Sequence, residues 1–343
     1  MNLLIQDPLD PDSRGLTSFQ IKNIMSGRVN SLRTPQHALV DLINHGWKGD
    51  LHLARRVSTN SLEAIRTFHG RALSGLGRTA AERLETFLVQ AKELTKLRSP
   101  AFASILDVGR AGKSVYVVSE YVRGSSLKEY WRLRKGSNSL EKLAEALRIA
   151  DAVAAALQWL HEQGRLHLDV TPYSVRRTMD GALKVLDPGL APLLIPRDLR
   201  QADPDVVLPA VAAPELLHGA GTVGPPADVY VLGETFRFLL TGEFSHQPMK
   251  LLNAVQKDDV RAEGPCSAVP WSGTNYAIHP RKSAFHERAE EFEDLIDAMQ
   301  VPDPASRIQD AAAVRLRLAS LRRSLAEDLK KFPPQTTGEG DSK

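Results

Sequence analysis

The sequence contains one cysteine, Cys266, among 343 residues. A single cysteine excludes an intrachain disulfide and a cysteine-based metal site, and it fits a reducing compartment. No segment approaches the roughly 18 apolar residues that a membrane-spanning helix requires. The N-terminus also lacks the basic start and apolar run of a secretory signal. We therefore expect a cytoplasmic protein with no membrane partner.

An excess of charge of one sign is also missing. Lys and Arg number 44 and Asp and Glu number 41, which gives a formal net charge of +3. Such a small excess creates no strong field, so nucleic acid is not expected as a partner. The hydrophobic fraction of 42% and the charged fraction of 25% are ordinary for a soluble globular protein, and the length suffices for two lobes or domains.

The pattern along the chain changes from strand-like to helical. Five short segments are apolar or alternating, as β-strands are: 38–43, 50–54, 62–68, 104–108 and 114–118. Among them, residues 80–97 carry apolar side chains at helical spacing, and a short helix is also expected over 16–25. A hairpin is predicted at Asp180-Gly181. The remaining predicted helices cover residues 140–162, 226–241, 288–300 and 309–325.

Two carboxylates stand on short polar turns in the middle of the chain. His167-Leu168-Asp169 and Asp187-Pro188-Gly189 each interrupt apolar, strand-like sequence. The first carboxylate is suited to meet a hydroxyl group and the second to bind a magnesium ion. Together they are typical of the acidic half of a phosphoryl-transfer site.

The order of these parts resembles the protein kinase fold, and most of all bacterial Ser/Thr kinases of the eukaryotic type, over roughly residues 37–322. The agreement extends to LRSP (97–100), DVG (107–109), YVVSEYVRG (116–124), APE (213–215), ADVYVLG (227–233) and DPASR (303–307). The APE and DPASR segments disfavour the alternative of an aminoglycoside-type phosphotransferase.

The resemblance implies an α+β fold of two lobes. We expect an N-terminal extension over 1–34, a small lobe of antiparallel sheet plus one helix over 35–122, a mainly helical lobe over 123–325, and a disordered tail over 326–343. ATP and Mg²⁺ are the cofactors that the family implies. By position, the nucleotide would contact Gly46, Gly49, Leu51, Ala64, Glu120 and Val122. Asp169 would be the catalytic base and Asp187 the metal ligand.

Several positions depart from the family pattern. The lysine of the third strand is replaced by Arg66, or by Arg56 in a rival register, and neither register supplies a lysine. Its glutamate partner on the helix is replaced by Gln90, although Glu93 lies one turn further on. An arginine–glutamine bond lacks the ion pair that normally fixes this helix.

The two polar turns are altered as well. Thr171 stands where a lysine assists the transferring phosphate, and Ser174 stands where an asparagine binds the second metal. Pro188 replaces the aromatic residue that follows the metal-binding aspartate. Arg176 falls where an apolar residue would support adenine. Residues 190–213 contain no Ser, Thr or Tyr, so phosphorylation cannot switch that segment.

Two functions follow from this pattern. The favoured one is a pseudokinase, a binding, scaffold or regulatory module for a protein partner, with weak or absent use of ATP and Mg²⁺. The alternative is an atypical active Ser/Thr protein kinase that transfers the γ-phosphate of ATP to a protein hydroxyl. In it, Asp169 accepts the proton, Asp187 binds magnesium and Arg66 replaces the lysine.

Overall fold

The structure is a computed structural model that describes residues 34–333 apart from 35, 47, 70–72, 74–78, 113, 135–138, 196–210, 219–222 and 244–279. The helix predicted over 16–25 and most of the segment without phosphorylatable residues lie outside the described residues. No helix in the described part of the chain is long and apolar enough to cross a membrane.

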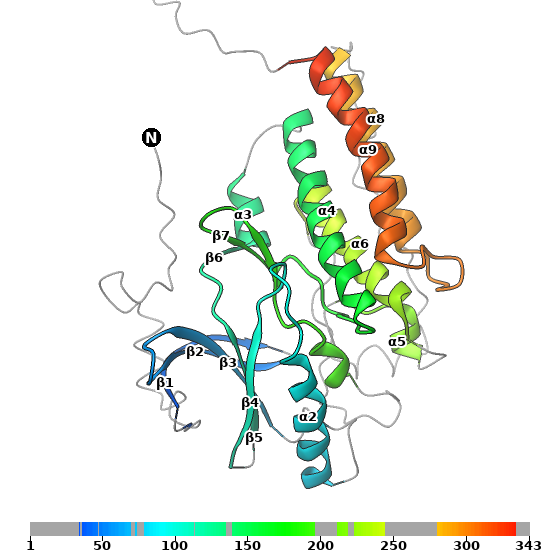
Figure 1. Ribbon diagram of the computed structural model, residues 1–343. Coiled ribbons are helices and arrows are strands. Elements are labelled where there is room, and N and C mark those ends of the chain that lie inside the picture. Colours follow the sequence, from blue (N-terminus) through cyan, green and yellow to red (C-terminus); the bar gives the residue numbers. More distant parts are fainter. Residues whose placement is uncertain are drawn as a thin grey trace, which may run out of the picture.

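The small lobe is a five-stranded antiparallel sheet of order β1-β2-β3-β5-β4 (Figure 1). The strands are β1 (His37–Gly46), β2 (Gly49–Arg56), β3 (Leu62–His69), β4 (Ile105–Ala111) and β5 (Ser114–Glu120). Helix α2 (Ala80–Leu94) begins at a capping box formed by Thr79 and Glu82, and it packs against β4 and β5. Phe68 and Phe87, both fully buried, join β3 to α2 with ring centroids 4.9 Å apart.

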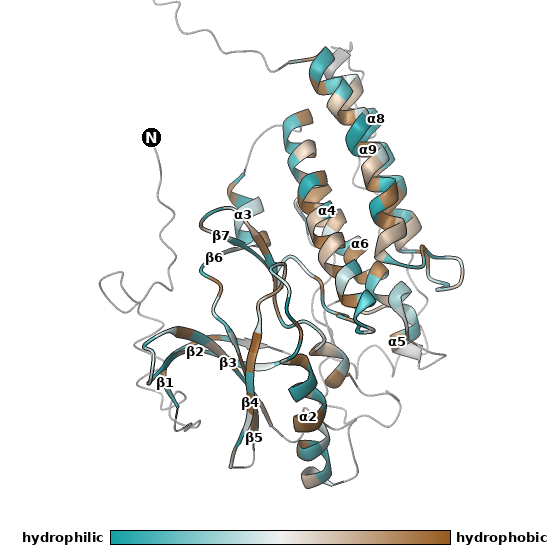
Figure 2. Ribbon diagram, in the orientation of Figure 1, coloured by the Kyte–Doolittle hydropathy of each residue, from teal (hydrophilic) through white to brown (hydrophobic). Residues whose placement is uncertain are grey.

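The large lobe is mainly helical. Its elements are β6 (Gly124–Ser126), α3 (Leu127–Leu133), α4 (Leu140–Glu162), β7 (Val175–Thr178), β8 (Leu183–Val185), η3 (Ala191–Leu193), α5 (Pro214–His218), α6 (Pro225–Thr241), α8 (Pro280–Met299) and α9 (Ala311–Lys331). Helix α4 contacts α6, α8 and α9, and its apolar middle contrasts with the mixed surface of α9 (Figure 2). Burial of Leu147, Ala154 and Leu157 on α4 places the core between these helices.

The predicted fold class is confirmed: the chain has a small antiparallel lobe with one helix and a mainly helical lobe. The bounds of α4 coincide with the predicted 140–162. Helix α8 begins at Pro280 rather than 288, and α9 ends at Lys331 rather than 325, so the expected boundary of a tail at 326 is wrong. The extra turns of α9 are held by Asp328, which accepts a bond of 2.9 Å from Arg288 on α8.

Candidate functional site

A buried carboxylate of α6 accepts hydrogen bonds from the backbone of the loop that carries Asp169. Asp228, in the first turn of α6, accepts hydrogen bonds from the backbone N–H groups of His167 (2.8 Å) and Leu168 (2.5 Å). Its Oδ2 also lies 2.9 Å from Nε2 of His161 on α4. These bonds hold Leu168 in a left-handed conformation, with φ of 58°, which a leucine rarely adopts without such support.

His167 joins this loop to the second carboxylate turn. Its Nδ1 accepts the backbone N–H of Asp169 at 3.2 Å, and its Nε2–H donates to the carbonyl of Leu186 at 2.9 Å. Burial lowers the pKa of His167, which favours the neutral ring that this pair of bonds requires. The imidazole therefore sets the spacing between the two turns that carry Asp169 and Asp187.

Four buried charged side chains meet between the lobes, and we call them the cleft cluster: Lys48, Arg66, Asp169 and Asp187. The ammonium Nζ of Lys48 lies 2.7 Å from Oδ2 of Asp169 and 2.6 Å from Oδ2 of Asp187. Nη2 of Arg66 lies 2.9 Å from the same oxygen of Asp187. Both cations come from the small lobe and both carboxylates from the large lobe.

The electrostatics of the cluster favour the charged forms of Lys48 and Asp187. Burial by itself would raise the pKa of Asp187, but Arg66 and Lys48 hold that pKa well below its usual range. Burial would likewise lower the pKa of Lys48, yet Asp169 and Asp187 raise it above its ordinary value. The cluster thus places two cationic side chains against two carboxylates.

Lys48 is the residue of the cleft cluster that the sequence did not reveal. Neither β2 nor β3 supplies a lysine at the predicted position, but the turn between β1 and β2 brings Lys48 into the cleft. Gly49, with φ of 100°, lies so close to β3 that an added Cβ would sit 2.1 Å from the carbonyl oxygen of Thr67. This close approach keeps the end of the turn tight against β3. One sequence signal could have indicated Lys48: it is the single cationic residue between Gly46 and Gly49, and these two glycines pair across the hairpin.

The structure also separates the two candidate arginines. Arg66 on β3 is buried and contacts Asp187. Arg56, at the end of β2, donates instead to Oε1 of Glu63 at 2.7 Å, and Glu63 in turn bonds His37 at 2.7 Å. Arg66 is therefore the residue that stands in the cleft.

The predicted helix partners do not join the cluster. Arg66 donates to Asp187 and not to Gln90, which lies half-buried on α2. Glu93, the possible substitute, is exposed and forms a 2.7 Å ion pair with Lys96, which lies two residues past the end of the helix. Helix α2 is therefore positioned by its packing on β4 and β5 rather than by an ion pair to Arg66.

Ser174 and Thr171 form hydrogen bonds within the loop that begins at Asp169. The hydroxyl of Ser174 donates to the carbonyl of Asp169 at 2.6 Å and accepts the backbone N–H of Thr171 at 2.9 Å. Both side chains are buried. The oxygen of Ser174 is thus directed to the backbone of its own loop, which shapes the turn beneath Asp169.

The residues predicted to contact a nucleotide lie on β1, β2 and β3 and at the connection between the lobes. Leu51 pairs directly with Arg66 and Leu53 with Ala64, so these side chains share one face of the sheet. Val122, after β5, is buried. Glu120 binds Nζ of Lys184 on β8 at 2.6 Å, and the Arg176 guanidinium donates to the carbonyl of Gly124. Two cations thus tie the connection between the lobes to β7 and β8, where the resemblance places adenine.

The cleft as arranged does not fit a divalent cation. Oδ2 of Asp187 already carries two cationic partners, and Ser174 faces its own backbone. Lys48 and Arg66 would repel a metal ion at this position. Among the described residues, no group of three or more His, Cys, Asp or Glu side chains is arranged to hold a metal elsewhere.

One further ion pair organises the large lobe. Arg307, with a fully buried side chain, makes two bonds to Glu215 of α5, at 2.7 and 3.0 Å. Arg307 also donates to the carbonyls of Val301, Pro302 and Pro226. This pair anchors α5, which carries the APE segment, to the loop before α9.

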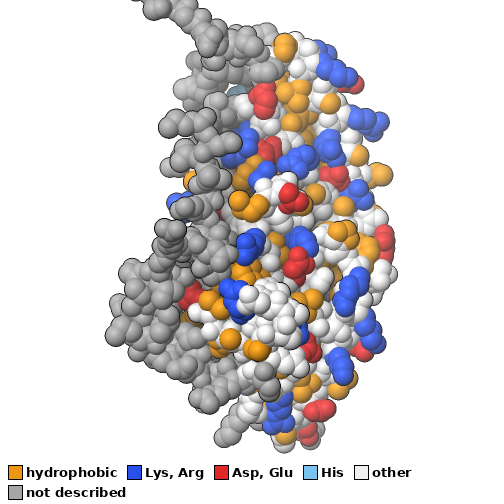
Figure 3. All heavy atoms as spheres, turned by 60° about the vertical axis from the view of Figure 1, so that its left-hand side comes forward, with side chains coloured by type: hydrophobic (Ala, Val, Ile, Leu, Met, Phe, Trp, Pro, Cys, Tyr) orange, Lys and Arg blue, Asp and Glu red, His pale blue; other side chains and the backbone are white. Residues whose placement is uncertain are grey.

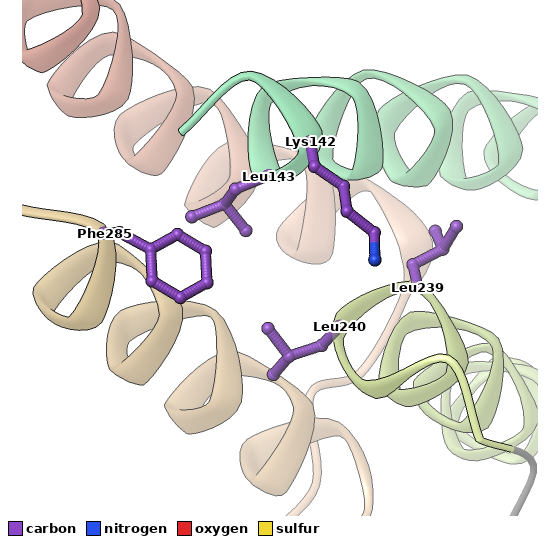
Figure 4. A pocket seen from close by; sticks show the side chains of 5 residues that line it. All are labelled: Lys142, Leu143, Leu239, Leu240 and Phe285. Carbon is purple, nitrogen blue, oxygen red and sulfur yellow. The ribbon is translucent and has the colours of Figure 1, made fainter. Parts of the chain in front are cut away.

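Two other features lie apart from the cleft. A small pocket between α4, α6 and α8 is lined by Lys142, Leu143, Leu239, Leu240 and Phe285, and shares no residue with the cleft cluster (Figure 4).

On the face drawn in Figure 3, the basic and acidic side chains of the described residues are interspersed. That mixture agrees with the small net charge of the chain.

The fold and the two carboxylate turns define a protein of the kinase class, and comparison with known families agrees. The protein kinase domain family matches residues 40–317. The chain therefore belongs to the protein kinase family.

Its relatives include bacterial Ser/Thr kinases. The chain is 28% identical to Ser/Thr kinase PrkC of Bacillus subtilis over 67% of its length and 35% of the relative. It is 28% identical to PknB of Mycolicibacterium smegmatis over 88% of its length and 46% of the relative. The chain thus spans less than half of the length of these two relatives. The solved PknI kinase domain of Mycobacterium tuberculosis is 19% identical and superposes with a TM-score of 0.57, covering 85% of this chain and 98% of that domain.

Proposed function

We propose that this chain acts as a pseudokinase, a kinase-shaped binding, scaffold or regulatory module for a protein partner, with weak or absent turnover of ATP. The single observation that supports this proposal is the occupation of Asp169 and Asp187 by Lys48 and Arg66. Both carboxylates that phosphoryl transfer would use are engaged by cations of the chain itself.

The first consequence concerns the candidate base. A catalytic carboxylate must lie within about 2.6–3.2 Å of the hydroxyl proton that it accepts. Oδ2 of Asp169 is instead 2.7 Å from Lys48, and the pair is buried. A substrate hydroxyl would have to displace the ammonium group before it could reach this oxygen.

The second consequence concerns charge. The usual kinase cleft holds one lysine, one helix glutamate and two aspartates, which leaves a negative excess for magnesium to neutralise. Here the glutamate is absent from the cluster and Lys48 adds a positive charge, so the excess is gone. The cleft therefore lacks the electrostatic reason to recruit a metal ion.

The partner in this proposal is a protein. The folded surface of a kinase-type domain remains available for docking when chemistry is lost. Because residues 190–213 contain no Ser, Thr or Tyr, phosphorylation cannot regulate this segment.

We also propose a cytoplasmic location, because a chain with one cysteine suits a reducing compartment.

Thermal unfolding of the full chain with ATP, with and without Mg²⁺, tests this proposal together with an assay of phosphate transfer to a protein substrate. A nucleotide at about 100 times its Kd would add about 2.7 kcal/mol of stability. We expect no Mg²⁺-dependent shift and no transfer. Metal-dependent stabilisation with transfer that disappears in Asp169→Asn would refute the proposal.

The alternative, an atypical active Ser/Thr protein kinase, gains one supporting observation. Lys48 brings a primary ammonium group into the cleft, so the missing lysine could be supplied by the β1–β2 turn rather than by Arg66. In that case Lys48→Met would abolish phosphate transfer while Arg66→Met would retain part of it. Absence of transfer by the unaltered protein excludes this alternative.

A further inference from the structure

The cleft cluster crosses from one lobe to the other. Lys48 belongs to the β1–β2 turn and Arg66 to β3, both in the small lobe, whereas Asp169 and Asp187 belong to the large lobe. Their three ion pairs are 2.6, 2.7 and 2.9 Å long, and each participating side chain is at most 10% exposed. The contact that joins the lobes here is thus electrostatic, short and shielded from water.

A second connection between the lobes is of a different kind. The segment before β4 exchanges backbone hydrogen bonds with β8: Ala103 N–H donates to the carbonyl of Val185 (2.9 Å), and Val185 N–H donates to the carbonyl of Ala101 (2.8 Å). The Glu120–Lys184 pair joins β5 to β8 as well. Backbone bonds do not depend on side-chain charge, so this connection is suited to act as the fixed edge of a hinge.

We propose that Lys48 is a latch between the lobes, which keeps the cleft closed without a nucleotide or a metal ion. Its ammonium group bridges two carboxylates that belong to different turns of the large lobe. Arg66 reaches only one of them. This inference concerns conformation, and it holds whether or not the protein transfers phosphate.

The charge balance explains why removal of Lys48 opens the cleft. Without the ammonium group, Asp169 and Asp187 remain buried with Arg66 as their cation, and Arg66 contacts Asp187 alone. A buried carboxylate with no cation is strongly unfavourable, and water can solvate it only if the lobes separate. The open arrangement therefore gains population in Lys48→Met, whose side chain is similar in length but uncharged.

The distance between the lobes can be measured by double electron–electron resonance. Spin labels would be attached to Ser58→Cys, in the exposed β2–β3 turn, and Ala319→Cys, on the exposed face of α9, with Cys266→Ser as background. We expect one narrow distance distribution for this protein, unchanged by ATP with Mg²⁺. Lys48→Met should add a broader population at altered distance. Lys96→Met, which removes an exposed ion pair at the C-terminal end of α2, should not.

Asp169→Asn serves as a second variant if Lys48→Met does not fold. It removes one of the two carboxylates, and we expect a smaller broadening. Identical distributions for the parent and for both variants would overturn the latch, as would a parent distribution that narrows only with ATP and Mg²⁺. Phosphate transfer by the parent would refute the proposed function but would leave this distance test intact.

Discussion

Lys48→Met should destabilise the protein far more than an ordinary surface substitution. Breaking a buried ion pair by removing one partner costs about 3–5 kcal/mol, because the remaining charge stays desolvated. Lys48 pairs with two carboxylates whose side chains are 8% and 9% exposed. Methionine nearly preserves the volume, so little cavity cost adds to this. We expect the free energy of unfolding to fall by about 3 kcal/mol. This value is the lower end of the range, because opening of the cleft lets water reach Asp169.

Urea unfolding followed by far-UV circular dichroism measures this loss, provided that the transition is cooperative. Lys96→Met is the matched control, since its ion pair with Glu93 is exposed and such pairs contribute about 0.2–1 kcal/mol. The double variant Lys48→Met with Asp169→Asn should recover part of the loss, because the uncompensated charge is then removed. A loss below about 1 kcal/mol for Lys48→Met would refute the reasoning.

Three other predictions concern the supports of the site. The folded pKa of Asp187 lies below its unfolded value, so its stabilising contribution is present above about pH 4 and is lost as pH falls through the folded value. The difference in unfolding free energy between the protein and Asp187→Asn should therefore shrink below pH 4 in urea titrations. Gly49→Ala should lower the free energy of unfolding by about 1–3 kcal/mol and weaken the cleft cluster, because the added Cβ meets the carbonyl of Thr67. Gly112→Ala is the control: Gly112 has a φ of 60° but open space around it, so this substitution should cost less. Arg307→Met should cost about 3–5 kcal/mol by leaving Glu215 buried without its cation, and a loss similar to that of Lys96→Met would contradict this.

The elements that local pattern governs could be predicted from the sequence. The apolar repeat of α4 predicts its bounds. The apolar side chains at helical spacing over 80–97 predict α2, which ends three residues earlier, at Leu94. The short helix α3 was not predicted, although Ser126 and Glu129 form a capping box at its start. A helix of seven residues offers too few turns for its periodicity to stand out.

The chemistry of the cleft could be predicted only in part. Asp169, Asp187 and Arg66 were placed by their position in the family order, and the structure brings all three together. Lys48 was missed because it meets Asp187 across 139 positions of sequence, and no periodicity reports such a contact. Gln90 was matched to a position by the same order, but the ion pairs of Arg66 and Lys48 lead to Asp187 and Asp169 instead.

Binding of Mn²⁺ tests most directly whether Lys48 and Arg66 take the place of a metal ion. Titration of the nucleotide-free protein, followed by electron paramagnetic resonance of free Mn²⁺, should show no site in the parent chain. Lys48→Met leaves a net negative charge on the cluster and should gain a site that Asp187→Asn in the same background removes. A site in the parent chain that depends on Asp187 would contradict the account.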